Sequence, residues 1–159
     1  MKELTLKKLA AWCGGDVDPA WENVKVTGTQ IDSRLVREGD LFIAIPGEKV
    51  DGHDFLAKAR EAGAAAALVS RRMDDPLPQI LVLDTVLAYG DIARSYREEA
   101  AVDVVAITGS VGKTTTKEMI ACVLAGKYRV SKTQGNHNNN LGLPITILEM
   151  PADTQEAVL

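Results

Sequence analysis

Aromatic residues, cysteines and long apolar runs are all scarce in this sequence. Phe, Trp and Tyr make up 4% of the 159 residues, so aliphatic side chains within the 46% hydrophobic fraction must build the core. The two cysteines, Cys13 and Cys122, stand among apolar residues in expected helices, which favours buried thiols in a reducing cytosol. No stretch approaches the roughly 18 apolar residues of a membrane span, and the N-terminal apolar stretch is too short for a signal peptide. We therefore expect a cytoplasmic protein without membrane insertion.

Positive charge is also too sparse for a protein that binds nucleic acid through a broad face. The formal net charge is -4, whereas such a face needs clustered Lys and Arg. The composition, with 25% charged residues, is that of a soluble globular protein. We therefore expect no nucleic-acid partner, although a local phosphate site stays compatible with this charge.

Strand-like and helix-like segments alternate along the whole chain. Runs of β-branched or aliphatic residues predict strands at 24–32, 41–45, 66–70, 79–84, 102–108 and 128–132. Capping residues and apolar periodicity predict helices at 6–13, 54–62, 85–100, 113–125 and 143–150. Asp54 and Thr85 are expected to cap two of these helices, and Met119 and Val123 to lie on the apolar face of another. The alternation predicts an α/β fold with largely parallel strands.

The expected domain boundary lies near residue 100, where this pattern restarts. The pattern in residues 1–100 predicts one small α/β domain. Residues 101–159 are expected to begin a second domain, which starts with a strongly β-forming run. Only two strands and two helices are predicted in the second part, whereas a nucleotide-binding sheet usually has about five or six strands. We therefore expect the second domain to be cut short.

A glycine-rich loop at 109–114 is the strongest functional signal. Its sequence, Gly-Ser-Val-Gly-Lys-Thr, follows a predicted strand and opens a predicted helix, which is the context of a phosphate-binding loop. The spacing is the short form G-x-x-G-K-T, since Ile107 occupies the place of the first glycine in the longer form. In such loops backbone N–H groups surround phosphates, the lysine reaches the β and γ phosphates, and the next hydroxyl binds Mg²⁺. The loop predicts chemistry that uses ATP; the alternative is a glycine-rich turn with a solvated lysine.

Several segments resemble the Mur ligase family, whose members add amino acids to the peptidoglycan precursor. Residues 107–119 resemble the family's ATP loop, with Val111 where many members have asparagine. Residues 133–144 resemble the branch that adds D-alanyl-D-alanine to UDP-N-acetylmuramoyl tripeptide, and motifs at 32–34, 39–42, 47–48 and 51–55 resemble its UDP-sugar domain. The resemblance implies an α/β fold with a small N-terminal UDP-substrate domain at 1–100 and the truncated start of a P-loop central ATPase domain at 101–159. The family's later Mg²⁺ ligands, its carbamylated lysine and its third domain would lie outside this sequence.

The same resemblance implies an ATP-dependent amide ligase of peptidoglycan and cell-wall synthesis, and thus a part in cell shape and division. ATP and Mg²⁺ would be its cofactors, UDP-N-acetylmuramoyl tripeptide and D-alanyl-D-alanine its substrates, and we expect a monomer. Lys113 and Thr114 would be the catalytic residues, with Lys113 stabilising phosphate charge and Thr114 ligating Mg²⁺. The ATP-binding residues would be Gly109, Ser110, Val111, Gly112, Lys113, Thr114 and Thr115.

The substrate-binding candidates are Ile31, Ser33, Glu48, Lys49, Asn138 and Asn139. By the resemblance, Ser33 would hydrogen-bond the uracil, Ile31 would pack on its face and the loop at Glu48–Lys49 would border it. The alternative for Ser33 is a turn hydroxyl that caps its own backbone. The two asparagines would contact the substrate diphosphate or ATP, and their alternative is capping and turn formation. The alternative for Arg34 is a structural role, paired with Asp32 or Asp40. His53 is expected to be a hydrogen-bonded loop histidine rather than a ligand.

Functions of other classes also stay open. The chain is compatible with an isolated UDP-ligand-binding module without catalysis, with another Mur-type ligase, and with an unrelated phosphate-loop ATPase or kinase. Binding of UDP and of ATP discriminates among these. Because most of the family's active site would lie outside residues 1–159, we expect this stretch alone to have no ligase activity.

Overall fold

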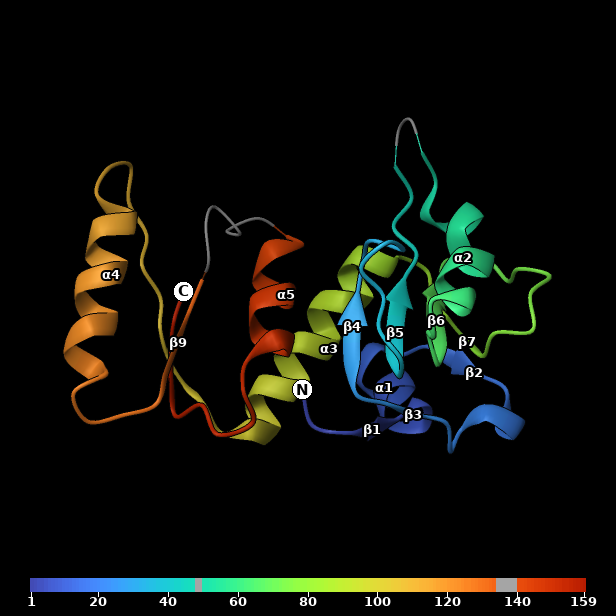
Figure 1. Ribbon diagram of the computed structural model, residues 1–159, viewed down its shortest axis with the longest axis horizontal. Coiled ribbons are helices and arrows are strands. Elements are labelled where there is room, and N and C mark those ends of the chain that lie inside the picture. The colour runs from blue at the N-terminus through green and yellow to red at the C-terminus, as the bar shows by residue number, and fades with distance from the viewer. Residues whose placement is uncertain (48–49, 134–139) are drawn as a thin grey trace. The chain divides into compact units, whose positions relative to one another are not determined.

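The computed structural model describes residues 1–47, 50–133 and 140–159, and it divides into two units (Figure 1). Unit 1 covers Met1–Ile92 and unit 2 covers Ala93–Leu159. The division falls within helix α3 (Thr85–Ala100), upstream of the boundary expected near residue 100. Within the described residues, no helix combines the length and the apolar character needed to cross a bilayer.

Unit 1 is built on a five-stranded sheet with the order β2-β7-β6-β5-β4. Four neighbouring strands run parallel, and β2 joins the edge antiparallel, which confirms the expected α/β fold with largely parallel pairing. The strands are β2 (Asp16–Val17), β4 (Gly28–Gln30), β5 (Asp40–Ile43), β6 (Ala66–Val69) and β7 (Gln79–Leu81). A separate antiparallel pair joins β1 (Leu4–Thr5) to β3 (Lys25–Val26), so the strand expected at 24–32 is two short strands.

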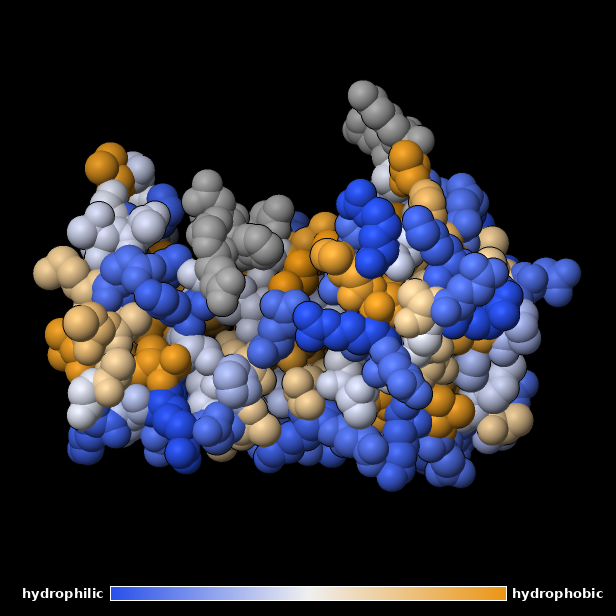
Figure 2. Space-filling view, viewed as in Figure 1, coloured by the Kyte–Doolittle hydropathy of each residue, from blue (hydrophilic) through white to orange (hydrophobic). Residues whose placement is uncertain are grey.

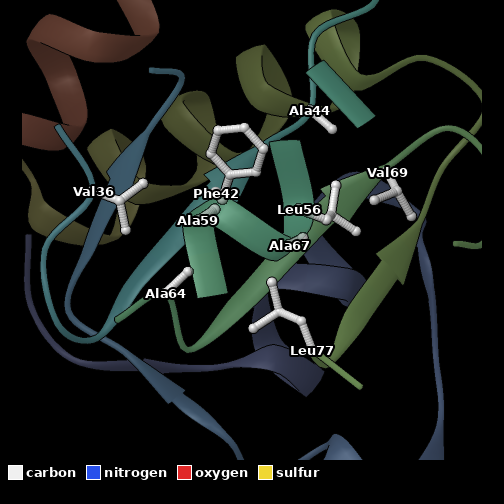
Figure 3. Close-up of a cluster of buried hydrophobic side chains, with 9 residues drawn as sticks. All are labelled: Val36, Phe42, Ala44, Leu56, Ala59, Ala64, Ala67, Val69 and Leu77. Atoms are coloured by element: carbon white, nitrogen blue, oxygen red, sulfur yellow. The ribbon is translucent and has the colours of Figure 1, made fainter. Parts of the chain in front are cut away.

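The core of unit 1 lies where α2 (Leu56–Glu61) covers β5 and β6. Every residue of these two strands is buried, which explains why they read as unbroken apolar runs rather than alternating ones. Figure 3 shows the side chains of the helix directed at those of the strands. The cluster contains Val36, Phe42, Ala44, Leu56, Ala59, Ala64, Ala67, Val69 and Leu77.

The helix caps of unit 1 are the expected ones at α1 (Leu6–Cys13) but not at α2 and α3. Thr5 accepts the N–H of Lys8, and Gly14 ends the helix with a φ of 63°. Asp54 is not a cap, because the 3₁₀ helix η2 (Gly52–Phe55) precedes α2 and is capped by Asp51. Thr85 is not a cap either. The Asp84 carboxylate accepts the N–H groups of Val86 and Leu87, and the buried Thr85 hydroxyl donates to the Ala44 carbonyl instead. The remaining 3₁₀ helix is η1 (Pro19–Trp21).

Unit 2 contains a parallel three-stranded sheet with the order β8-β10-β9. Its elements are β8 (Asp103–Val105), α4 (Lys113–Leu124), β9 (Val130–Lys132), α5 (Gly142–Glu149) and β10 (Glu156–Val158). The expectation of two strands was wrong, because β10 inserts between the other two. Its residues are too few and too polar at their start to show strand periodicity.

Helix α4 presents a different face to the sheet from the one that its apolar residues predict. Met119 is 65% exposed and Val123 is 78% exposed, whereas Lys117 and Ala121 are buried. Cys122 is exposed on the same helix, so the expectation of a buried thiol was wrong there. Cys13 is half-buried, and burial raises the pKa of its thiol.

Candidate nucleotide and substrate sites

The glycine-rich loop leaves the sheet at the carboxyl end of β8 and leads into α4, as the sequence predicts. Gly109 has a φ of 147° and Gly112 a φ of 81°, a region of backbone conformation that side-chain-bearing residues rarely adopt. A Cβ built on Gly112 would meet nothing within 4 Å, so its backbone faces open space. The loop therefore offers its main chain to a ligand at the start of a helix.

The N-terminus of α4 is left open to an anion. Gly112 is the N-cap residue; the described residues provide no side-chain hydrogen bond to this cap, and the first turn contains no acidic residue. The first N–H groups of a helix have no partner within the helix, and its macrodipole places positive charge at the same end. The helical bonding begins with the Thr116 N–H and the Gly112 carbonyl, 2.9 Å apart. This end of α4 therefore has the donors and the charge that bind a phosphate group.

The predicted ATP-binding side chains gather around that opening. Lys113 folds across the loop, and its ammonium donates to the Gly109 carbonyl at 2.6 Å. Ser110 and Val111 form the exposed tip, with Val111 92% exposed. Thr114 and Thr115 are exposed in the first turn of the helix. The structure thus brings all seven of these residues together on one loop and one helix end.

The Thr114 hydroxyl is the Mg²⁺ donor that the sequence predicts in this part of the chain. The described residues contain no group of three or more His, Cys, Asp or Glu side chains able to hold a metal ion. Mg²⁺ in nucleotide sites keeps several waters and relies on substrate phosphates, so one hydroxyl fits an ion carried mainly by a nucleotide. The residues present are therefore compatible with Mg²⁺ bound together with a phosphate chain.

Lys117 is a residue of this region that the sequence analysis missed. It is 8% exposed, and its ammonium donates to the Thr133 carbonyl at 2.5 Å, which joins α4 to the residue directly after β9. The Thr133 hydroxyl is also buried, and it has no hydrogen-bond partner among the described residues. The sequence offered no signal for this contact, because its two residues lie 16 positions apart.

A second candidate site is a hollow of about 570 Å³ in unit 1. It brings together Ile31 and Ser33, two of the predicted substrate-binding residues, at the carboxyl ends of β4 and β5. Its apolar lining is Ile31, Phe42, Ile45, Val50 and Phe55, and its polar lining includes Asp32, Ser33, Arg34 and Lys58. On the face shown in Figure 2, apolar surface over β4 and β5 borders strongly hydrophilic residues. Such a mixture suits a flat ring joined to a charged group.

Two basic residues, Arg34 and Lys58, line this hollow, and they differ in whether an acidic side chain pairs with them. Arg34 lies 2.6 Å from Asp32, and this hydrogen-bonded guanidinium lowers the pKa of Asp32 to about 2. Arg34 thus has the structural pairing that the sequence left open. Lys58 is exposed, and no acidic partner lies within 4.0 Å of it among the described residues. The ammonium of Lys58 thus has no ion pair there, although its charge contributes to lowering the pKa of Asp32.

Ser33 lies in a turn that another residue caps. The Asp32 carboxylate accepts the Arg34 N–H at 3.0 Å, and the Asp32 carbonyl accepts the Leu35 N–H at 3.0 Å. The Ser33 side chain takes no part in these bonds, although the residue is 7% exposed. This arrangement weakens the alternative in which Ser33 caps its own turn. The other predicted substrate-binding residues, Glu48, Lys49, Asn138 and Asn139, lie outside the described residues.

Comparison with known proteins identifies relatives of both units. The description "Mur ligase family, catalytic domain" matches residues 25–107, and "Mur ligase middle domain" matches residues 107–159. UDP-N-acetylmuramoyl-tripeptide–D-alanyl-D-alanine ligase of Bacillus subtilis (strain 168) is 44% identical over 163 residues, covering 100% of this chain and 36% of the relative. The Escherichia coli (strain K12) enzyme of the same name is 40% identical, covering 100% of this chain and 35% of the relative. The chain therefore spans about a third of the length of these curated relatives.

Solved structures agree with the sequence relatives. Crystal structure II of MurF from Acinetobacter baumannii aligns with a TM-score of 0.92 and 36% identity, covering 100% of this chain and 35% of that one. A MurF ligase from Thermotoga maritima in complex with ADP aligns with a TM-score of 0.77 and 38% identity, covering 84% and 31%. The fold described above is thus that of the corresponding part of these ligases.

Proposed function

Since the chain belongs to the Mur ligase family, we propose that it provides the UDP-substrate and nucleotide sites of an ATP-dependent ligase that joins D-alanyl-D-alanine to UDP-N-acetylmuramoyl tripeptide. The observation that carries this proposal is the open N-terminus of α4 behind Gly112, because it supplies a phosphate site in a chain whose relatives bear that ligase name. Under the proposal, residues 1–100 form the substrate domain and residues 101–159 begin the ATP-binding domain. The protein acts in the cytoplasm as a monomer and supports cell shape and division through peptidoglycan synthesis.

The loop residues have distinct roles in this reaction. The backbone of Gly109, Ser110, Val111 and Gly112 holds the phosphates, and Lys113 neutralises the negative charge that develops as the γ-phosphoryl group passes to the tripeptide carboxylate. The amine of D-alanyl-D-alanine then attacks the acyl phosphate, and phosphate leaves as the amide forms. Thr114 and Thr115 contribute hydroxyls beside the phosphate chain, and Mg²⁺ held at Thr114 would supply further charge neutralisation. Catalysis by this part of the chain is therefore positioning and electrostatic stabilisation.

The hollow of unit 1 is assigned to the uridine diphosphate portion of the substrate. Ile31 packs on the uracil, Ser33 hydrogen-bonds it, and Lys58 meets the diphosphate. Three observations support this assignment: the apolar lining, the exposed ammonium of Lys58, and a turn whose capping bonds do not involve the Ser33 side chain. Glu48, Lys49, Asn138 and Asn139 remain assigned to substrate contact on the family resemblance.

Calorimetric titration of the chain with UDP and with ATP plus Mg²⁺ tests the proposal. We expect both to bind, Lys113→Ala to weaken ATP about tenfold or more without changing UDP affinity, and Ser33→Ala to do the reverse. Lys132→Ala is the matched control, because this exposed lysine of unit 2 pairs with Glu118 and lies outside the loop. ATP binding without UDP binding would support an unrelated phosphate-loop ATPase, and UDP binding alone would support a simple binding module. Amide formation by residues 1–159 alone would contradict our expectation that this stretch lacks ligase activity.

A further inference from the structure

One wall of the unit 1 hollow is formed by residues 45–47, which follow β5, and residues 50–52, which lead into η2; we call these two segments the arm (Figure 1). The Gly52 N–H donates to the Ile45 carbonyl at 2.9 Å, and Pro46 forms an antiparallel bridge with Asp51. Ile45, Val50 and Gly52 of this arm line the hollow. The position of the arm therefore sets the shape of that wall.

A buried histidine lies at the root of the arm. His53 is 1% exposed; its Nε2 is 2.9 Å from the backbone N of Ser70, and its Nδ1 is 2.6 Å from the Asp51 carboxylate. A backbone N–H only donates, so Nε2 must accept and the ring proton must reside on Nδ1, from which it is donated to Asp51. His53 thus bridges Asp51 of the arm and Ser70, the residue directly after β6.

Asp51 completes this link with charge. Its carboxylate accepts the His53 N–H at 2.9 Å and also lies 2.8 Å from the Arg71 guanidinium. These hydrogen bonds, first from the His53 backbone, then from its ring and from Arg71, hold the pKa of Asp51 well below its usual range. Asp51 is therefore an anion that ties the arm to two consecutive residues beyond β6.

We propose that His53 is a positioning residue, which fixes the arm (residues 45–47 and 50–52) against the end of β6 and thereby sets the affinity of the hollow for a uridine diphosphate group. The inference rests on the function proposed above for the hollow. A buried histidine with both ring nitrogens bonded needs no ligand of its own, so its effect on binding passes through the arm. Ile45 continues from β5, whereas Asp51 is joined to Pro46 by a backbone bridge and to the end of β6 by side-chain bonds. Loss of those side-chain bonds detaches Asp51 from the end of β6 and leaves the bridge to Pro46.

Three substitutions of His53 separate its bonds. His53→Gln keeps an acceptor near the place of Nε2 for the Ser70 N–H, His53→Asn keeps a donor near the place of Nδ1 for Asp51, and His53→Leu keeps neither. UDP affinity is measured by calorimetry at a temperature well below the unfolding midpoint of each variant. We expect His53→Leu to weaken UDP binding about tenfold or more, and His53→Gln to restore it to within about threefold of the original.

Arg71 and Arg72 give a matched pair for the ionic part of the link. Both are exposed and paired with a carboxylate, but Arg72 pairs with Asp16 at 2.7 Å and, among the residues that the structure describes, makes no bond to the arm. Arg71→Ala should weaken UDP binding, and Arg72→Ala should not. This pair keeps the proposal testable if His53→Leu fails to fold.

Hydrogen exchange of the Gly52 and Ser70 amides separates failure of this inference from failure of the proposed function. Loss of the link should speed exchange at both amides relative to amides within β5, whether or not UDP is the ligand. Faster exchange in a chain that binds no UDP would overturn the assignment of the hollow and leave the positioning role intact. Folded His53→Leu with unchanged exchange and unchanged UDP affinity would overturn the positioning role itself.

Discussion

Replacement of Gly52 by alanine should destabilise unit 1, because the new methyl group has no room. A Cβ on Gly52 would lie 2.6 Å from the Ile45 N, 2.8 Å from the Ile45 O and 3.0 Å from the Ala44 C. All three atoms belong to the backbone that continues from β5, so no side-chain rotation relieves the contact. Carbon contacts become favourable near 3.5 Å, so the arm must move by about 1 Å. Such overpacking typically costs about 1–3 kcal/mol.

Gly90→Ala is the control, with an expected effect of opposite sign. Gly90 lies inside α3, and a Cβ built there meets nothing within 4 Å. Alanine has the higher helix propensity, so this variant should gain up to about 1 kcal/mol. Both chain tryptophans, Trp12 and Trp21, lie in unit 1, so tryptophan fluorescence during urea unfolding reports this unit alone. If Gly52→Ala unfolds at the original urea midpoint, the close approach described here is wrong.

Two further changes probe polar contacts made by buried residues of the same unit, Thr29 and His53. Tyr89→Phe should lower the unfolding free energy by about 1–3 kcal/mol, because the Tyr89 hydroxyl is 2.9 Å from the buried Thr29 hydroxyl; an unchanged urea midpoint would argue against this bond. Asp51→Asn should destabilise unit 1 at neutral pH. The folded pKa of Asp51 is lowered, so its carboxylate stabilises the fold above the unfolded pKa of about 3.9, and this contribution is lost as pH falls through the folded pKa. Urea unfolding of both proteins from pH 6 to pH 2 should therefore show curves that converge in acid, and a constant difference would contradict the argument.

The parts of the fold that the sequence predicted are those determined by neighbouring residues. The phosphate loop is one example, since strand, glycines, lysine and helix follow each other within residues 102–125 and the structure keeps that order. The C-cap at Gly14 is another, because a left-handed turn after a helix strongly favours glycine. The capping errors arose where two capping residues stand close together. At Asp84 and Thr85, the hydroxyl forms a bond to Ala44, 41 residues away, and leaves the cap to the carboxylate.

The rotation of α4 and the existence of β10 depend on contacts that are distant in sequence. Ile120 and Leu124 of the expected apolar face are half-buried, whereas Met119 and Val123 are exposed. The buried Lys117 donates its ammonium hydrogen bond to the carbonyl of Thr133, 16 positions away and beyond β9. Strand β10 has only three residues, yet each pairs with a residue of β8 on one side and of β9 on the other. Neither feature leaves a periodic signal in the chain.

The two candidate sites are marked by short sequence motifs, whereas the residues that hold these sites in place are not. Val111 occupies a position where many Mur ligases have asparagine, and its side chain is 92% exposed. A loop that binds phosphate through its backbone, as we propose, would tolerate this change. The supports are single buried side chains that bond to the backbone of another element, His53 to Ser70 across 17 positions and Lys117 to Thr133 across 16. Each support connects a ligand-facing segment to the end of a parallel strand. A motif therefore locates the chemistry, whereas the residues that hold it in place become visible only when the strand order is known.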